Sequence, residues 1–359
     1  MEKMYTVDEA IFHLLTSVPP KNRDVLERDL ADALPADLRL EYEEIKEGKK
    51  RPSLSSDIIA KRIFDPDEHP DRLEFLLRGI TKDDTIEIAG SVGNEGYKKS
   101  SGSKKVIFDI PAKLLDGRLS DTEFQVSQQD YIFERGEIYS SEMLMIQYSV
   151  NPGEKKGDLD YDNAKGTILI MLMLNSPDKL KQFESDRYIH RFTEHISDTG
   201  FRIRSLQNII YVQLDKCLTQ FKQNLDGEGN EALQLLLAAI ADINNPLVAE
   251  NAKESEMVAS ILKEVEELSQ TKEVQSMLLA EKYAQADLNA AFSFQKREGR
   301  AEGRAEGRAE GRAEGRAEGR AEGRAEQSIE TYKRCIAKGM TVQDAIEISG
   351  ISEKDLLLV

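Results

Sequence analysis

Six short segments between residues 85 and 215 have the pattern of β-strands, and a helical stretch separates the first three from the last three. Each segment is either alternately apolar and polar or apolar throughout, and turn-forming residues bound it. The first three predict an antiparallel meander, and their mixture with helices predicts an α/β domain. The six segments are 85–90, 104–113, 122–127, 167–174, 187–197 and 206–215.

Helical patterns surround these strands. The first begins near Thr6, which forms a capping box with Glu9, and residues 1–52 are predicted to be a helical N-terminal extension. Two further helices are expected in residues 55–80, and another in residues 131–146, directly after the third strand segment.

Beyond Lys216 nearly the whole sequence has a helical pattern, so the predicted fold includes an all-helical C-terminal extension. Acidic residues are concentrated in the first part of that extension. From these changes in composition we predict a helical extension, a strand-containing domain, an acidic helical region, a tandem repeat and a small helical cap. Their boundaries are 1–52, 53–224, 225–297, 298–326 and 327–359.

The tandem repeat contains seven identical copies of Gly-Arg-Ala-Glu. On a helix, no Glu–Arg pair of this repeat falls at i+3 or i+4, so the segment gains no ion pairs within one chain. Each glycine costs a lone helix about 1 kcal/mol. Three interpretations stay open: a frayed helix, a semi-flexible helical spacer, which we favour, and a helix stabilised by another chain. In the last case, Arg stripes would face Glu stripes in a homo-oligomer.

The net charge of -17 argues against a protein that binds nucleic acid over its whole surface, so any DNA contact should be local. Cys217 and Cys335 form no disulfide or metal-binding pattern, which favours a reducing cytoplasm. The most apolar run, 167–174, is too short for a membrane helix, and the N-terminus has no signal-peptide pattern. We therefore expect a cytoplasmic protein without membrane contact.

Three polar residues stand out in the second and third strand segments. Asp109 is expected within the strand 104–113, and Glu123 and Gln125 share one face of the next strand. Pairing of the two strands would bring Asp109 beside Glu123. Two carboxylates a few Å apart repel each other, and a Mg2+ bound between them removes that repulsion. Phosphodiester hydrolysis uses this geometry. By spacing alone, solvated acids at strand ends are the simpler interpretation.

The surrounding sequence resembles the PD-(D/E)XK nuclease superfamily, and within it the recombination-promoting nuclease (Rpn) or putative transposase family. The resemblance rests, in order, on the helix SSDIIAKRIF, the leucine-rich helix LEFLLRGI, the aspartate of VIFDIPAK, the EFQ triplet and the helix with ERGEIYSS. It covers roughly half of the chain. It implies a restriction-endonuclease-like mixed sheet flanked by helices.

This resemblance assigns roles to individual residues. Asp109 and Glu123 match the metal-binding carboxylates, and Gln125 stands where most superfamily members have lysine, a substitution that is usual in this family. Asp57 matches an acidic position of the first helix that can face the same site; a first-turn acid stabilised by the helix dipole is the alternative. The implied cofactor is Mg2+, as one or two ions, with Mn2+ as a substitute.

Further residues are candidates for contact with DNA. Arg135 and Tyr139 match an Arg and a Tyr of the family, and an arginine there can hold a phosphate through two hydrogen bonds. Pairing of Arg135 with acids near it in sequence is the alternative. Lys113 and the lysine-rich loop 97–105 would contact the DNA backbone, unless they are simply solvated.

Together these features predict a Mg2+-dependent DNA endonuclease of the bacterial cytoplasm, linked by the resemblance to recombination or mobile DNA. The alternative is a catalytically weak or inactive nuclease fold that acts as a DNA- or protein-binding module. The acidic net charge and the missing lysine keep that alternative open.

Overall fold

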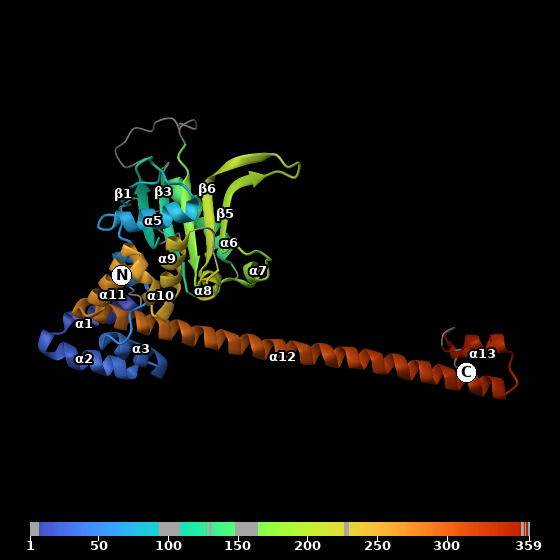
Figure 1. Ribbon diagram of the computed structural model, residues 1–359. Helices are drawn as coiled ribbons and strands as arrows, with labels where there is room; N and C mark the ends of the chain where they lie inside the picture. The colour runs from blue at the N-terminus through green and yellow to red at the C-terminus, as the bar shows by residue number, and fades with distance from the viewer. Residues whose placement is uncertain are drawn as a thin grey trace, which may run out of the picture. The chain divides into compact units, whose positions relative to one another are not determined.

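The computed structural model describes residues 7–92, 108–126, 128, 131–147, 164–225, 230–352, 355 and 357. Figure 1 shows its helices and strands, and its contacts divide the chain into two units, residues 1–284 and 285–359. The strands are β1 (Ile88–Ser91), β2 (Ile110–Leu114), β3 (Leu119–Gln125), β4 (Thr167–Met173), β5 (Ile189–Ile196) and β6 (Arg202–Gln213). The helices up to β5 are α1 (Val7–Ser17), α2 (Pro20–Ala33), α3 (Ala36–Lys46), α4 (Asp57–Ile63), α5 (Pro70–Thr81), α6 (Ile132–Gln147) and α7 (Asp178–Lys181). After β6 follow α8 (Leu214–Lys222), α9 (Glu231–Ala241), α10 (Pro246–Asn251), the 3-10 helix η2 (Ala252–Glu254), α11 (Glu256–Ser269), α12 (Lys272–Ala337) and α13 (Val342–Ser349).

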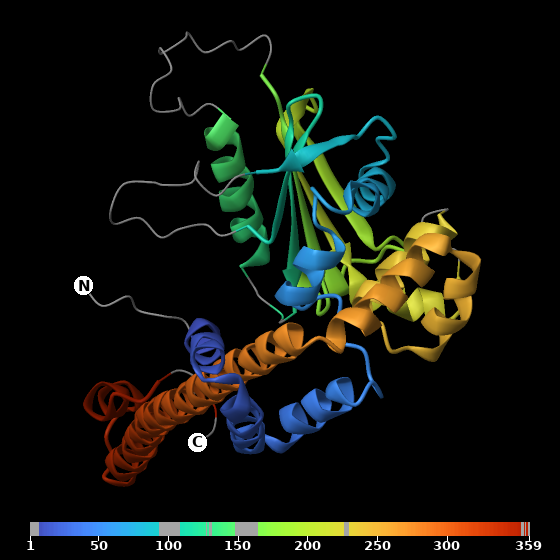
Figure 2. The same cartoon turned by 90° about the vertical axis from the view of Figure 1, so that its left-hand side faces the viewer.

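The strands form one mixed sheet in the order β1-β2-β3-β4-β6-β5. Neighbours among β1, β2 and β3 are antiparallel, as the meander predicted, whereas β3, β4 and β6 are parallel and β5 is an antiparallel edge strand. Figure 2 shows α6 on one face of the sheet and α5 on the other. The predicted α/β fold, a mixed sheet flanked by helices with a helical C-terminal region, is confirmed.

Strand β4 is apolar throughout because both of its faces are buried. Its side chains enter two hydrophobic clusters in alternation. Ile168 and Ile170 pack with residues of α4, α5 and α9, while Leu169 and Met171 pack with residues of α6. The strand therefore lies at the centre of the fold, between the two helical layers.

The helices of the acidic region contribute to the same core. Leu236 of α9 and Val258 and Ile261 of α11 are fully buried and belong to the cluster that contains Ile168 of β4. This explains why α9 is apolar on nearly all sides, with eight consecutive buried residues from Leu233 to Ile240. One hydrophobic core thus includes residues on both sides of residue 224.

One expected strand starts later in the structure. Asp109 was predicted to lie within the strand 104–113, but β2 begins at Ile110 and Asp109 immediately precedes it. Its carboxylate, rather than a main-chain carbonyl, accepts the backbone N–H of Phe124 of β3 at 2.9 Å. The regular main-chain ladder therefore ends one residue after Asp109. Residues 104–107 lie outside the described part of the chain.

Helix α12 contains the whole repeat and continues without a break from Lys272 to Ala337. The structure describes every residue of 298–326, and no ion pair joins any two of them, as their spacing predicts. Nearly all of these residues are exposed. Among the described helices none has the length and apolar character needed to cross a bilayer.

Gly136 allows α6 to pack closely on the sheet. A Cβ at this position would overlap the hydroxyl group of Tyr211 and lie 3.3 Å from Ile209 Cγ2. We expect Gly136→Ala to lower the free energy of unfolding by about 1–3 kcal/mol, because α6 has to move away from the sheet despite alanine's better helix propensity. Urea unfolding of the full chain measures the change. Gly315→Ala, which meets no atom within 4 Å, is the helical control; a stable Gly136→Ala chain would contradict the packing.

Candidate functional site

Three acidic side chains gather where β2 and β3 pair, and we call Asp109, Asp121 and Glu123 the carboxylate cluster. Because side chains alternate along a strand, Asp121, Glu123 and Gln125 share the face of β3 that α6 covers. All three are buried, and Asp109 is partly buried. Asp121 was missed in the sequence, although the alternation that groups Glu123 with Gln125 includes it.

Hydrogen bonds between the two strands fix the cluster. The backbone N–H of Asp109 donates to Glu123 Oε1 at 3.2 Å, and the N–H of Phe124 donates to Asp109 Oδ2 at 2.9 Å. The N–H of Ile110 donates to Asp121 Oδ1 at 3.1 Å. Each carboxylate thus accepts a main-chain hydrogen bond from the neighbouring strand, so Asp109 and Glu123 lie together as expected from strand pairing.

Burial raises the pKa of every acid in the carboxylate cluster. The pKa of Asp109 rises to about 6, that of Asp121 to about 7 and that of Glu123 to about 10. After burial, repulsion from the neighbouring carboxylates is the next cause for Asp121 and Glu123. Without an added cation, the cluster therefore retains a proton at neutral pH.

Arg135 of α6 brings a positive charge to the carboxylate cluster. Its Nη2 donates to Glu123 Oε2 at 2.8 Å and to the Tyr139 hydroxyl at 2.9 Å, and its Nη1 donates to Gln125 Oε1 at 3.4 Å. The guanidinium carbon lies 4.7 Å from the centre of the Tyr139 ring, and Phe108 contacts that ring edge-on. Arg135 therefore pairs with Glu123, a residue of the sheet.

Asp57 begins α4 and remains largely exposed, with an ion pair to Lys61 at 3.7 Å. The charge of Asp57 raises the pKa of Asp109 and that of Lys61 lowers it, after the larger effect of burial. The first turn of α4 therefore lies close enough to act on the cluster electrostatically. In the described part of the chain, no hydrogen bond joins Asp57 to the cluster itself.

A buried side chain of α12 holds the start of α4. Glu281 accepts a hydrogen bond from the Ser56 hydroxyl at 2.7 Å and another from the backbone of Asp57. Burial raises the pKa of Glu281, and the charge of Asp57 adds to that effect. Ser56 is the residue before α4, but its hydroxyl makes no capping bond within that helix. Glu281 therefore takes over the role of the cap from another element.

Lys113 lies on β2, exposed and opposite Leu119 of β3. This register places it on the same face of the sheet as the carboxylate cluster, four residues along the strand from Asp109. The lysine-rich loop predicted to contact DNA, residues 97–105, lies outside the described residues.

The donor atoms of the carboxylate cluster suit a hard divalent cation. Among the described residues no three His, Cys, Asp or Glu side chains converge in the manner of a preformed metal cage. Mg2+ does not need such a cage, since it is usually bound by one or two carboxylates and keeps several waters. Burial, and after it repulsion between the carboxylates, raises the pKa of Asp121 and Glu123, and a bound cation would offset this cost. Asp109 and Glu123 are therefore suitable ligands.

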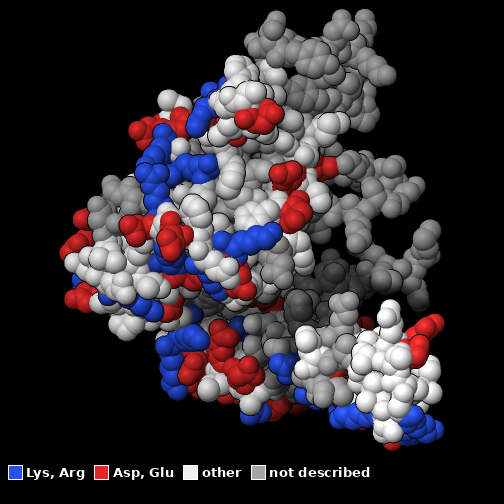
Figure 3. Space-filling view, turned by 90° about the vertical axis from the view of Figure 1, so that its right-hand side faces the viewer, with Lys and Arg blue, Asp and Glu red and all other residues white. Residues whose placement is uncertain are grey.

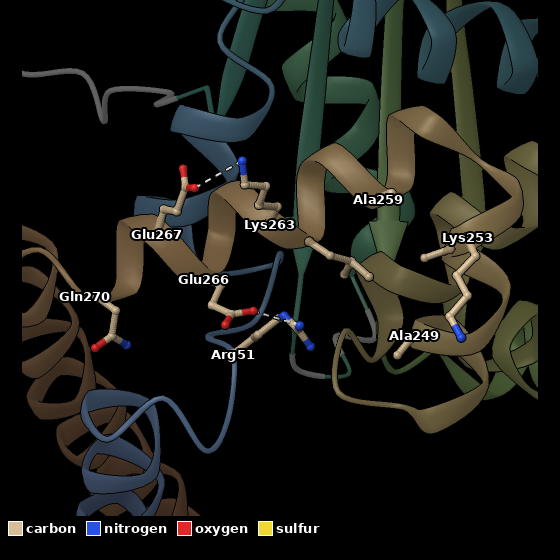
Figure 4. A pocket seen from close by; sticks show the side chains of 10 residues that line it. Arg51, Ala249, Lys253, Ala259, Lys263, Glu266, Glu267 and Gln270 are labelled. Atoms are coloured by element: carbon tan, nitrogen blue, oxygen red, sulfur yellow. Dashed lines mark hydrogen bonds and ion pairs between the residues drawn. The ribbon is translucent and has the colours of Figure 1, made fainter.

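A cavity lies elsewhere in the first unit. It has a volume of about 700 Å³ and is lined by residues of α10, η2 and α11 together with Arg51 (Figure 4). Arg51 is paired with Glu266 at 2.9 Å, and Lys263 with Glu267 at 3.5 Å. Because the cavity shares no residue with the carboxylate cluster, we assign no activity to it.

The surface on the side of β5 and β6 carries both signs of charge. Figure 3 shows Lys and Arg next to Asp and Glu over this face, without a continuous basic surface. Such a pattern agrees with the net charge of -17 and with local rather than extended contact to phosphates.

The raised pKa of Asp121 predicts a pH-dependent stability. A carboxyl whose pKa is higher in the folded than in the unfolded state destabilises the fold as pH rises from about 4 to its folded pKa, here about 7. We expect Asp121→Asn to be more stable than the intact chain by about 1–3 kcal/mol at pH 8 in EDTA, with the difference vanishing near pH 4. The amide can still accept the N–H of Ile110.

Urea unfolding at several pH values tests this expectation. Asp198→Asn, which removes an exposed acid between β5 and β6, is the control and should leave the pH dependence unchanged. A stability difference for Asp121→Asn that is the same at pH 4 and pH 8 would contradict the assigned role of burial.

Comparison with known proteins adds one positive finding. A family model described as PD-(D/E)XK nuclease family transposase matches residues 54–294, which include the whole sheet, α6 and the carboxylate cluster. No curated protein and no solved structure matches the chain.

Proposed function

The chain belongs to the PD-(D/E)XK nuclease family transposases, and we propose that it is a metal-dependent DNA endonuclease that hydrolyses phosphodiester bonds at the carboxylate cluster. Family membership makes it a nuclease-type protein linked to mobile DNA. The observation that supports cleavage most directly is the meeting of Asp109 and Glu123 at the end of β2, with Arg135 on the outer oxygen of Glu123.

In this proposal Asp109 and Glu123 hold one or two Mg2+, which Mn2+ can replace. When bound, the ion supplies a water of lowered pKa and stabilises negative charge on the phosphate. The main-chain N–H groups that bond Asp109 and Glu123 keep both carboxylates in place while substrate enters. The exposed Asp57, close enough to Asp109 to shift its pKa, orients a water on the side of α4.

Arg135 supplies the positive charge that lysine gives most members of the superfamily. Gln125, at the lysine position, is neutral, but its side-chain oxygen accepts a hydrogen bond from Arg135. A guanidinium stays charged at all relevant pH values, so it cannot serve as a base; it can hold a phosphate oxygen and stabilise charge in the transition state. Tyr139 positions it by hydrogen bond and ring contact, and Lys113 contacts the DNA backbone further along β2.

Plasmid nicking tests the proposed activity. With Mg2+ or Mn2+ we expect the intact chain to convert supercoiled DNA to the nicked form, EDTA to abolish this, and Asp109→Ala or Glu123→Ala to slow it by about a hundredfold or more. Asp116→Ala, in the turn of the same β2–β3 hairpin, is the control and should cleave like the intact chain. Equal cleavage by all four chains would exclude the proposed site. DNA binding without cleavage by any of them would favour the binding module.

A pair of substitutions tests the role of Arg135. We expect Arg135→Gln to lower the cleavage rate about a hundredfold, since it removes the only cation bonded to Glu123 in the described chain. Gln125→Lys alone should not raise the rate, because a cation is already present, but combined with Arg135→Gln it should restore part of the loss. A clear gain from Gln125→Lys in the otherwise intact chain would show that Arg135 does not fill the lysine's place.

A further inference from the structure

The repeat places four different side chains on four separate stripes of α12. Successive residues of a helix differ by about 100°, so Gly and Ala stripes lie on roughly opposite sides, with the Arg stripe on one flank and the Glu stripe on the other. A four-residue period exceeds 3.6 residues, so each stripe turns by about 40° per copy in a right-handed sense. The glycine face and the alanine face of residues 299–326 therefore each have an acidic flank and a basic flank.

In a single copy of this helix, the charged side chains of the repeat form no ion pairs with one another. Its like charges recur at i+4, its opposite charges miss the i+3 and i+4 positions, and the structure shows no ion pair within 298–326. Its seven glycines each lower helix stability by about 1 kcal/mol. No atom lies within 4 Å of a Cβ built on any of them, so nothing in the chain compensates for these losses.

We propose that residues 299–326 pair in parallel, and in register, with the same residues of a second copy of this chain. When two parallel helices face each other, the left flank of one meets the right flank of the other, so the Arg flank of each copy meets the Glu flank of its partner. In an antiparallel pair the same flanks meet, which opposes Arg to Arg and Glu to Glu. Charge therefore selects both the partner and its direction.

The glycine stripe is the side by which the helices meet. Without a Cβ, the two backbones can approach closely, and a seam that follows this stripe requires a right-handed crossing of about -40°, the geometry known for glycines spaced four apart. The close approach also brings the flanking charges within reach of one another. Glycine thus lowers the stability of the helix in a single chain, but it allows the backbones of two paired helices to come into close contact.

Charge balance argues against DNA as the partner of this segment. The repeat has as many Glu as Arg side chains, seven of each in residues 299–326. Because the stripes turn by about 40° per copy, a phosphate backbone lying straight along this helix would pass from arginines to glutamates, and the repulsion would offset the attraction. A second copy of the chain, in contrast, can form ion pairs with both the arginines and the glutamates of the repeat.

Sedimentation of the full chain tests the proposal, and its readout is independent of nuclease activity. We expect the intact chain to be a dimer at micromolar concentration, and to dissociate as NaCl is raised from about 50 mM to 500 mM. Changing Arg→Glu in all seven copies, as in Arg300→Glu, or Glu→Arg in all seven, as in Glu302→Arg, should each raise the dissociation constant about a hundredfold or more. An equimolar mixture of these two variants should restore the dimer.

A matched control exchanges both residues within each copy, as in Arg300→Glu together with Glu302→Arg. This variant keeps composition, net charge and helix propensity, and the glycine face still has one flank of each sign, so it should dimerise like the intact chain. Helicity of all variants is checked by circular dichroism. A monomeric intact chain, or dimers of unchanged stability in both single-sign variants, would overturn the proposal.

Disulfide trapping tests the direction of pairing. In a Cys335→Ser background, Gly299→Cys should form homodisulfides in the dimer, since equivalent residues face each other in a parallel pair. A chain with Gly323→Cys should do the same at the other end of the repeat. Disulfides that form only when the two variants are mixed would show an antiparallel pair and overturn the assigned direction.

Discussion

The reciprocal hydrogen bonding between Asp109 and β3 is the contact on which the candidate site depends. Asp109 donates its backbone N–H to Glu123 and accepts the N–H of Phe124 on its own carboxylate. Side chains thereby replace the main-chain ladder at the end of β2, and two acids are held together inside the fold at a cost that shows in their raised pKa values. Arg135 offsets part of this cost from α6, and a divalent ion would offset the rest.

Much of this arrangement could be predicted from the sequence, and the exceptions have physical causes. Alternation along a strand is local, so it placed Glu123 and Gln125 on one face correctly, and it would have added Asp121 had the strand been started at Leu119. The partner of Arg135 is not local. Acids near it in sequence were equally plausible partners, and only the packing of α6 on the sheet selects Glu123. The beginning of β2 was predicted too early, because the Asp109 carboxylate takes the place of a main-chain acceptor for Phe124. The pattern of apolar residues does not reveal such a replacement.

The core shows a similar division between local and non-local information. The apolar run of β4 indicated a strand, and the structure shows that both of its faces are buried. The acidic character of residues 225–297 described only the outer surfaces of α9 and α11. Their inner surfaces complete the core against the sheet, in the same cluster as residues of α4 and α5. The net charge of a segment describes its solvent-exposed surface and does not predict which elements its buried surface contacts.

Helix α12 connects the carboxylate cluster to the repeat within one continuous element. Its first turns belong to the first unit, where Glu281 holds the start of α4 and Tyr283 donates to the carbonyl of Leu30 at 2.6 Å. If the repeats pair in parallel, both first units are attached to the same end of the pair; in an antiparallel pair they would be attached at ends about 40 Å apart, the length of the repeat as a helix. The direction that the charges select therefore sets at which end of the pair each first unit is attached.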